Sequence, residues 1–147
     1  MFKRLLVPVD GSVYSNQAVA AAVNLARQYQ SSVWLLHVIR HLSLPAEILA
    51  MIAAGEVTES RQEILENSAE IILENAKKQF ESAGVTSVHT EYVFGTPSKQ
   101  ITDYAVSHNI DLIIIGQRGV SSEDENMLGG VARKLTNIAK TSCLIIK

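Results

Sequence analysis

The sequence predicts an α/β protein, a single three-layer domain with a five-stranded parallel sheet over residues 1–147. Short apolar or β-branched runs alternate along the whole chain with segments whose apolar residues recur at helical spacing. The runs at 5–9 and 112–115 are apolar on both faces, which is typical of parallel strands covered on both sides. A chain of 147 residues suits one hydrophobic core.

The first half of the chain gives two strands and two helices. Residues 5–9 predict a strand that ends before Asp10, residues 15–30 have the apolar spacing of a helix, and residues 33–39 are β-branched and aromatic enough for a second strand. Ser60 and Glu63 fit a capping box at the start of a second helix, which ends at Gly84. The segment before it, residues 40–59, is open to two interpretations, a short helix or a flap.

The second half continues the same alternation. Residues 87–94 alternate polar and apolar side chains, which predicts a strand at an edge of the sheet. Thr96 before Pro97 predicts a capped third helix that ends at Asn109. A strand at 112–115, a helix at 131–140 and a last strand at 143–147 complete the sheet. Because parallel sheets bind ligands beyond the carboxyl ends of their strands, we expect the functional site there.

Composition excludes several function classes. The net charge is −2 and the 13 basic residues are scattered, so a nucleic-acid partner is not expected. The apolar run near the amino terminus is too short for a signal peptide or a membrane span, so we expect a cytoplasmic protein that does not enter membranes. Cys143 is the sole cysteine and the four histidines lack metal-ligand spacing, so no metal site is expected.

Two segments that follow strands carry unusual chemistry. Residues 8–12 leave the carboxyl end of the first strand. A loop with Gly116 and Gly119 follows the fourth strand and leads to Gly129 and Gly130 at the start of a helix. Glycines let a ligand approach backbone N–H groups, and a helix amino terminus carries partial positive charge, so the pattern fits a phosphate cradle. The alternative is that these glycines only turn the chain and start the helix. The spacing by itself leaves both interpretations open.

The combination of a strand followed by VDGS, a strand followed by GQRG, a Gly-Gly pair nine residues later, a helix and a short last strand resembles the universal stress protein family. The family's nucleotide signature is Gly, two residues, Gly, nine residues, Gly and then Ser or Thr. This chain matches it at Gly116, Gly119 and Gly129 and departs from it at Gly130. The resemblance implies a Rossmann-like fold of the adenine nucleotide alpha hydrolase-like type, ATP as the cofactor and a homodimer formed through the fifth strand. Whether Mg²⁺ accompanies the nucleotide is left open.

The resemblance also implies roles for single residues. It places Asp10 near the ribose and adenine, and Val38 as a wall against the adenine, although Asp10 also fits a turn residue and Val38 a core residue. Arg118 points either into the crevice toward phosphate or out to solvent. The expected nucleotide-binding residues are Pro8, Val9, Asp10, Val38, Gly116, Arg118, Gly119, Gly129, Gly130 and Val131.

Two features count against nucleotide binding. Gly130 stands where the family has a hydroxyl, which removes one hydrogen bond of about 0.5 to 1.5 kcal/mol. Glu123, Asp124 and Glu125 lie inside the loop and either face solvent, repel phosphate or help to hold Mg²⁺. The rival hypothesis is therefore a structural dimer of the same fold that works through protein contacts without a nucleotide.

The sequence does not predict an efficient enzyme. It has no GxxxxGK[ST], GxGxxG or GxSxG motif and no general base paired with a nucleophile in the expected crevice. We therefore expect a nucleotide-dependent signalling or protective module with, at most, slow ATP hydrolysis. A phosphotransfer receiver or small hydrolase is disfavoured, because Asp10 has no acidic neighbour and no helix follows the last strand.

Overall fold

The computed structural model describes residues 1–40, 50–51, 53–55, 61–119 and 128–147. A five-stranded sheet runs through the protein in the order β3-β2-β1-β4-β5, and every neighbouring pair is parallel. The elements, in chain order, are β1 (Arg4–Pro8), α1 (Val13–Tyr29), β2 (Ser32–Ile39), α3 (Arg61–Ser82), β3 (Val88–Phe94), α4 (Pro97–Ser107), β4 (Leu112–Gly116), α5 (Gly130–Ile138) and β5 (Ser142–Ile146). This architecture confirms the predicted fold class.

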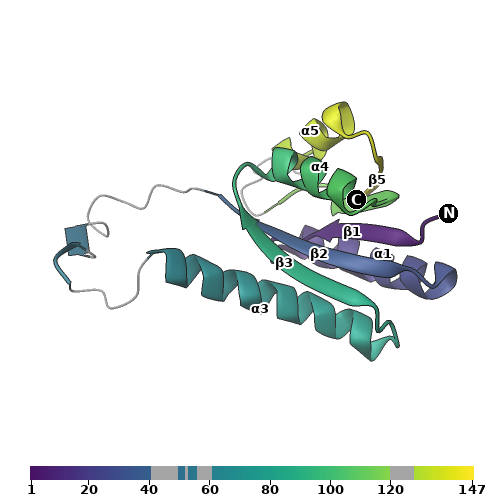
Figure 1. Ribbon diagram of the computed structural model, residues 1–147, viewed down its shortest axis with the longest axis horizontal. Coiled ribbons are helices and arrows are strands. Elements are labelled where there is room, and N and C mark those ends of the chain that lie inside the picture. The colour runs from purple at the N-terminus through teal and green to yellow at the C-terminus, as the bar shows by residue number, and fades with distance from the viewer. Residues whose placement is uncertain (41–49, 52, 56–60, 120–127) are drawn as a thin grey trace.

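Helices cover both faces of the sheet and make three layers, with α1 and α3 on one side and α4 and α5 on the other (Figure 1). Alternate residues of the central strand β1 enter two separate cores. Leu5 and Val7 pack with Phe80 of α3, while Leu6 packs with Ile101 of α4. Because both faces of β4 and of β1 after Arg4 are buried, residues 5–8 and 112–115 are apolar, which is the pattern that predicted these strands.

The two edges of the sheet differ in chemistry. β3 forms one edge, as predicted, and His89, Thr90 and Glu91 on it are exposed. β5 forms the other edge, where Leu144 is 38% exposed. Cys143 on β5 is half-buried, and this burial raises the pKa of its thiol.

The first helix begins earlier than the predicted residue 15. Ser12 is the N-cap of α1, and its Oγ accepts a hydrogen bond from the Ser15 backbone N–H at 3.1 Å, so the helix starts at Val13. Apolar spacing located the helix, but it did not reveal the cap, because Ser12 lies before the first buried position. At the other end the chain leaves the helix through Gln30, a left-handed residue with φ 52°.

The other helix ends agree with expectation to within a few residues. Thr96 occupies the N-cap position of α4 and Pro97 follows at its start, but the Thr96 side chain makes no capping hydrogen bond. Gly84 has φ +85° and Asn109 has φ +53°, which are the left-handed conformations expected after helices. Helix α5 spans Gly130–Ile138 instead of 131–140.

Some expectations fall outside the described residues. They concern the Ser60 half of the capping box, most of the segment 40–59 and the acidic residues Glu123, Asp124 and Glu125. Within the part of the chain that the structure describes, no helix combines the length and apolar character needed to cross a bilayer.

Candidate nucleotide-binding site

The carboxyl ends of β1, β2 and β4 open into one cavity of about 460 Å³. Parallel pairing of β1 with β4 brings the turn after β1 next to the glycine loop, although more than a hundred residues separate them. Pockets that bind small molecules have volumes of about 300–1,000 Å³. The cavity is lined by all ten residues selected from the sequence, Pro8, Val9, Asp10, Val38, Gly116, Arg118, Gly119, Gly129, Gly130 and Val131.

Asp10 stabilises the turn that follows β1. Its Oδ1 accepts a hydrogen bond from the Ser12 N–H at 2.9 Å, and its own N–H donates to the Ser15 Oγ at 3.3 Å. The other carboxylate oxygen faces the glycine loop, because a Cβ added to Gly119 would lie 2.6 Å from Asp10 Oδ2. The expected turn role is therefore present, and the carboxylate also borders the cavity.

Two of the loop glycines are needed for contacts between backbone segments. A Cβ on Gly116 would lie 2.5 Å from the Tyr14 carbonyl oxygen, so the absence of a side chain lets the first turn of α1 rest on the end of β4. A Cβ on Gly129 would lie 3.1 Å from the Arg118 Cα, and the Gly129 N–H donates to the Gln117 carbonyl at 2.8 Å. Close packing of the backbone therefore explains why residues 116 and 129 are glycines, whether or not a ligand binds.

The start of α5 presents backbone donors to the cavity. Gly129 is the N-cap, has φ −63°, and makes no side-chain capping bond. The first backbone bond of the helix runs from the Arg133 N–H to the Gly129 carbonyl at 3.0 Å, and the N–H groups before it have no partner inside a helix. Since Gly130, Val131 and Ala132 line the cavity, these donors and the positive end of the helix dipole favour an anion there.

Arg118 is buried beside the cavity, so of its two expected orientations the solvent-facing one is wrong. The side chain is 9% exposed, its guanidinium carbon lies 4.3 Å from the centre of the Tyr14 ring, and its Nη2 donates to the Tyr14 hydroxyl. Its Nε is buried and has no hydrogen-bond partner among the described residues. The described residues form two ion pairs, Lys77–Glu81 and Lys99–Asp103, and neither involves Arg118.

The sequence interpretation missed His37 as a residue of this site. His37 is half-buried near the carboxyl end of β2, and its Nδ1 lies 2.7 Å from the Val9 carbonyl oxygen. Because a carbonyl can only accept, Nδ1 carries the proton. The position of His37 near the carboxyl end of β2 is a signal that could have placed it at the cavity. The apolar sequence around it in β2 fits a core histidine equally well.

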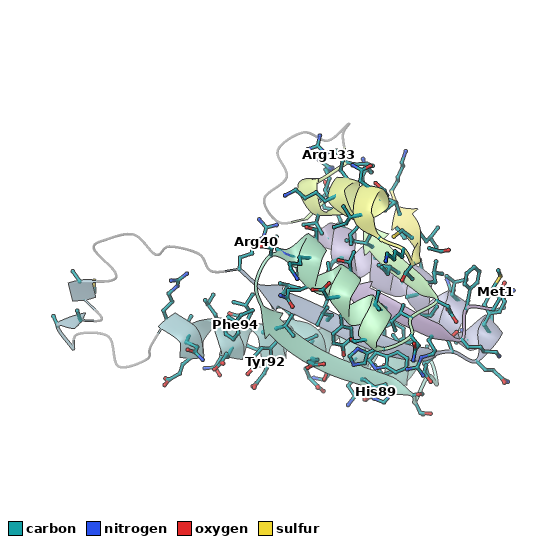
Figure 2. The ribbon with its side chains drawn as sticks, turned by 45° about the horizontal axis from the view of Figure 1, so that its top comes forward. Met1, Arg40, His89, Tyr92, Phe94 and Arg133 are labelled. Carbon is teal, nitrogen blue, oxygen red and sulfur yellow. The ribbon has the colours of Figure 1, made fainter. Side chains whose placement is uncertain are left out.

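The second strand contributes two more side chains. Val38 lines the cavity and also packs against the core on the side of α4 and α5. It is therefore both a wall of the cavity and a core residue, the two alternatives expected for it. Arg40 also lines the cavity and follows β2 directly, near the end of β3 that carries Phe94 and away from His89 (Figure 2). Among the described residues, no three His, Cys, Asp or Glu side chains lie close enough together to hold a metal ion.

The comparison with known proteins gives one consistent family. The sequence model of the Universal stress protein family matches residues 1–147. The Universal stress protein YxiE of Bacillus subtilis is 35% identical over 150 residues, with all of both chains covered. The solved structure of MJ0577 of Methanocaldococcus jannaschii has a TM-score of 0.81 and 27% identity, over 100% of this chain and 96% of that one.

Further solved structures share the fold. The universal stress protein UspA of Lactobacillus plantarum has a TM-score of 0.78 and 26% identity, over 99% of this chain and 98% of that one. A universal stress protein in complex with cAMP has a TM-score of 0.69 and 23% identity. One from Archaeoglobus fulgidus in complex with dAMP has a TM-score of 0.69 and 20% identity.

Proposed function

The chain belongs to the universal stress protein family, and we propose that it binds ATP in the cavity beyond β1 and β4, as a nucleotide-dependent signalling or protective module of the stress response. The observation that carries the proposal is that the ten expected residues, which come from four separate segments of the chain, line one cavity of about 460 Å³. We propose that residues 1–147 act as one domain in this role.

The cavity offers a suitable environment to each part of the nucleotide. Pro8, Val9 and Val38 supply an apolar wall for the adenine, and the Asp10 carboxylate supplies acceptors for ribose hydroxyls. At the other end, the N–H groups at the start of α5 and the buried Arg118 guanidinium favour phosphate. Any Mg²⁺ would arrive with the phosphates, because this ion is usually held through phosphate oxygens and one or two carboxylates.

Two proteins of this fold bind adenine mononucleotides, cAMP in one and dAMP in the other. These two proteins are similar to this chain in fold, and that similarity does not identify the ligand of this chain. The choice of ATP therefore depends on the phosphate-binding end of this chain's own cavity. A buried cation next to a helix amino terminus favours a ligand with several negative charges. This is the reason to propose a triphosphate as the preferred ligand.

The proposed role is binding, with slow ATP hydrolysis at most. His37 lines the cavity and donates its Nδ1 proton to the Val9 carbonyl, so Nε2 is the nitrogen able to accept a proton. Among the described residues no nucleophilic side chain is hydrogen-bonded to this imidazole, so the pair that efficient hydrolysis needs is not formed. We further propose that the protein acts in the cytoplasm as a homodimer through β5, with neither nucleic acid nor membrane as a partner.

The test is whether adenine nucleotide accompanies the purified protein. We expect heat-precipitated protein to release adenine nucleotide that chromatography and mass spectrometry identify, or Mg-ATP to raise the melting temperature of nucleotide-free protein. Mg-GTP at the same concentration is the matched control, since it has the same phosphates and a different base. No release together with no shift at millimolar ATP would contradict the proposal.

The rival function is a structural dimer that works without nucleotide. It is favoured by Gly130, which leaves α5 without the hydroxyl that completes the family signature. Under this rival, the glycines at 116 and 129 are explained by backbone packing alone. A stable dimer that shows neither bound nucleotide nor an ATP-dependent melting shift would support it.

A further inference from the structure

Tyr14 contacts Arg118, a residue of the cavity, but belongs to neither the glycine motif nor the family signature. Its ring lies under the guanidinium carbon of Arg118 at 4.3 Å, and its hydroxyl accepts a hydrogen bond from Arg118 Nη2. One side chain thus contacts Arg118 in two ways, through a cation–π interaction and through a hydrogen bond. Both contacts fix the plane of the guanidinium.

The backbone holds Tyr14 in place from two directions. Tyr14 lies in the first turn of α1, which is capped by the Ser12 Oγ. Its carbonyl oxygen rests against Gly116, at a distance that leaves no room for a Cβ. The ring therefore projects from a point where the start of a helix and the end of a strand are packed together.

Within the described residues, the charge of Arg118 is compensated only in part. It is 9% exposed, so its guanidinium has lost most of its hydration, and burial of a cation is costly without an anion or full hydrogen bonding. Tyr14 accepts one of its five N–H donors. The Nε remains buried without a partner among the described residues, while the side chain lines the cavity.

We propose that Tyr14 is a positioning residue, which holds the Arg118 guanidinium in the orientation that binds the phosphate groups of the nucleotide. This inference rests on the proposed function and deepens it by assigning phosphate recognition to a two-residue unit. Arginine suits phosphate because its planar donors bind two oxygens at once, and that geometry needs a fixed plane. The tyrosine supplies the plane and occupies only one of the five N–H donors.

The experiment is calorimetric titration of the full chain with Mg-ATP and, separately, with adenosine. The variants are Tyr14→Phe, which keeps the ring and removes the hydroxyl, Arg118→Gln, and the double variant. We expect Arg118→Gln to weaken ATP roughly tenfold or more and Tyr14→Phe to weaken it roughly two- to tenfold, with adenosine affinity unchanged in both. In the Arg118→Gln background, Tyr14→Phe should add almost nothing, because the two residues act as one unit.

Tyr29→Phe is the matched control, since it makes the same change at the far end of α1, where Tyr29 packs on Phe2. It should leave both affinities unchanged. Provided that wild type binds ATP, three results would overturn the inference. They are ATP binding by Tyr14→Phe that is unchanged or tighter, an equal loss of adenosine affinity, and a loss of ATP affinity that persists in the Arg118→Gln background. Absence of ATP binding by wild type would instead overturn the proposed function, and the inference with it.

Discussion

The three glycines of the loop signature differ in what a side chain would meet. A Cβ on Gly116 would strike the Tyr14 carbonyl, and one on Gly129 would press on the Arg118 Cα, so both would shift backbone. A Cβ on Gly119 would meet only the Asp10 carboxylate, which is the movable end of a side chain. Substitution at Gly119 therefore disturbs the site more than the fold, whereas overpacking at Gly116 would cost about 1–3 kcal/mol of stability.

Gly119→Val should weaken ATP binding at least tenfold in a folded protein. The added side chain displaces the Asp10 carboxylate and occupies the space where phosphate would approach the backbone. Thermal unfolding checks the fold, and calorimetric titration gives the affinity. Unaltered affinity in folded Gly119→Val would remove the loop from the site.

Gly130→Ser should strengthen ATP binding by up to about tenfold, for one hydrogen bond of roughly 1.4 kcal/mol. Gly130 is the first residue of α5, is not among the positive-φ glycines, and has open space where a Cβ would be added. AMP affinity should hardly change, since the added hydroxyl lies toward the outer phosphates. Titrations of both nucleotides are compared with Gly130→Ala, which shares any gain in helix stability. Equal gains for AMP and ATP would mean that serine acts through stability alone.

Helices α1 and α4 both have a hydroxyl residue at the N-cap, but only the one in α1 makes a capping hydrogen bond. The Ser12 Oγ accepts from the Ser15 N–H at 3.1 Å, whereas the Thr96 side chain makes no capping bond and α4 begins with Pro97. Proline has no N–H to satisfy and its φ already suits a helix start. The same sequence signal thus has different energetic weight in the two helices.

Ser12→Ala should lower the free energy of unfolding by about 1 kcal/mol, the usual value of an N-cap hydrogen bond. Thr96→Ala is the matched control and should change it by less than about 0.5 kcal/mol, because no capping bond is lost. Urea unfolding at a fixed nucleotide concentration measures both. Equal losses would mean that the Thr96 hydroxyl stabilises α4 in solution.

Periodicity predicted the elements well because each strand or helix buries one stripe or both faces against its neighbours. The placement of Asp10 and Gly119 also followed, since adjacent parallel strands bring their carboxyl ends together. The roles of Tyr14 and His37 did not follow, because each contacts a residue on another segment, and local spacing holds no information on such pairs. The buried orientation of Arg118 depends on the same long-range contact with Tyr14.

At the scale of the whole molecule, the order of strands places the site and the free edges in different parts of the sheet. The cavity lies beyond the central strands β1 and β4, while β3 and β5 form the edges. At the β3 edge three successive polar residues are exposed, and polar or charged side chains discourage edge pairing. At the β5 edge Leu144 is 38% exposed and Ile138 of the neighbouring α5 is 53% exposed.

An apolar edge strand pairs readily with a second copy, so we expect a homodimer through β5. Leu144→Lys should convert it to a monomer, because a lysine would bring a charge into the interface formed by two copies of this edge. Thr90→Lys makes the corresponding change at the β3 edge, where Thr90 is exposed, and should leave the dimer intact. Light scattering at tens of micromolar protein gives the mass of each. A monomeric wild type would exclude the dimer at that concentration, and a dimer lost only in Thr90→Lys would move the interface to β3.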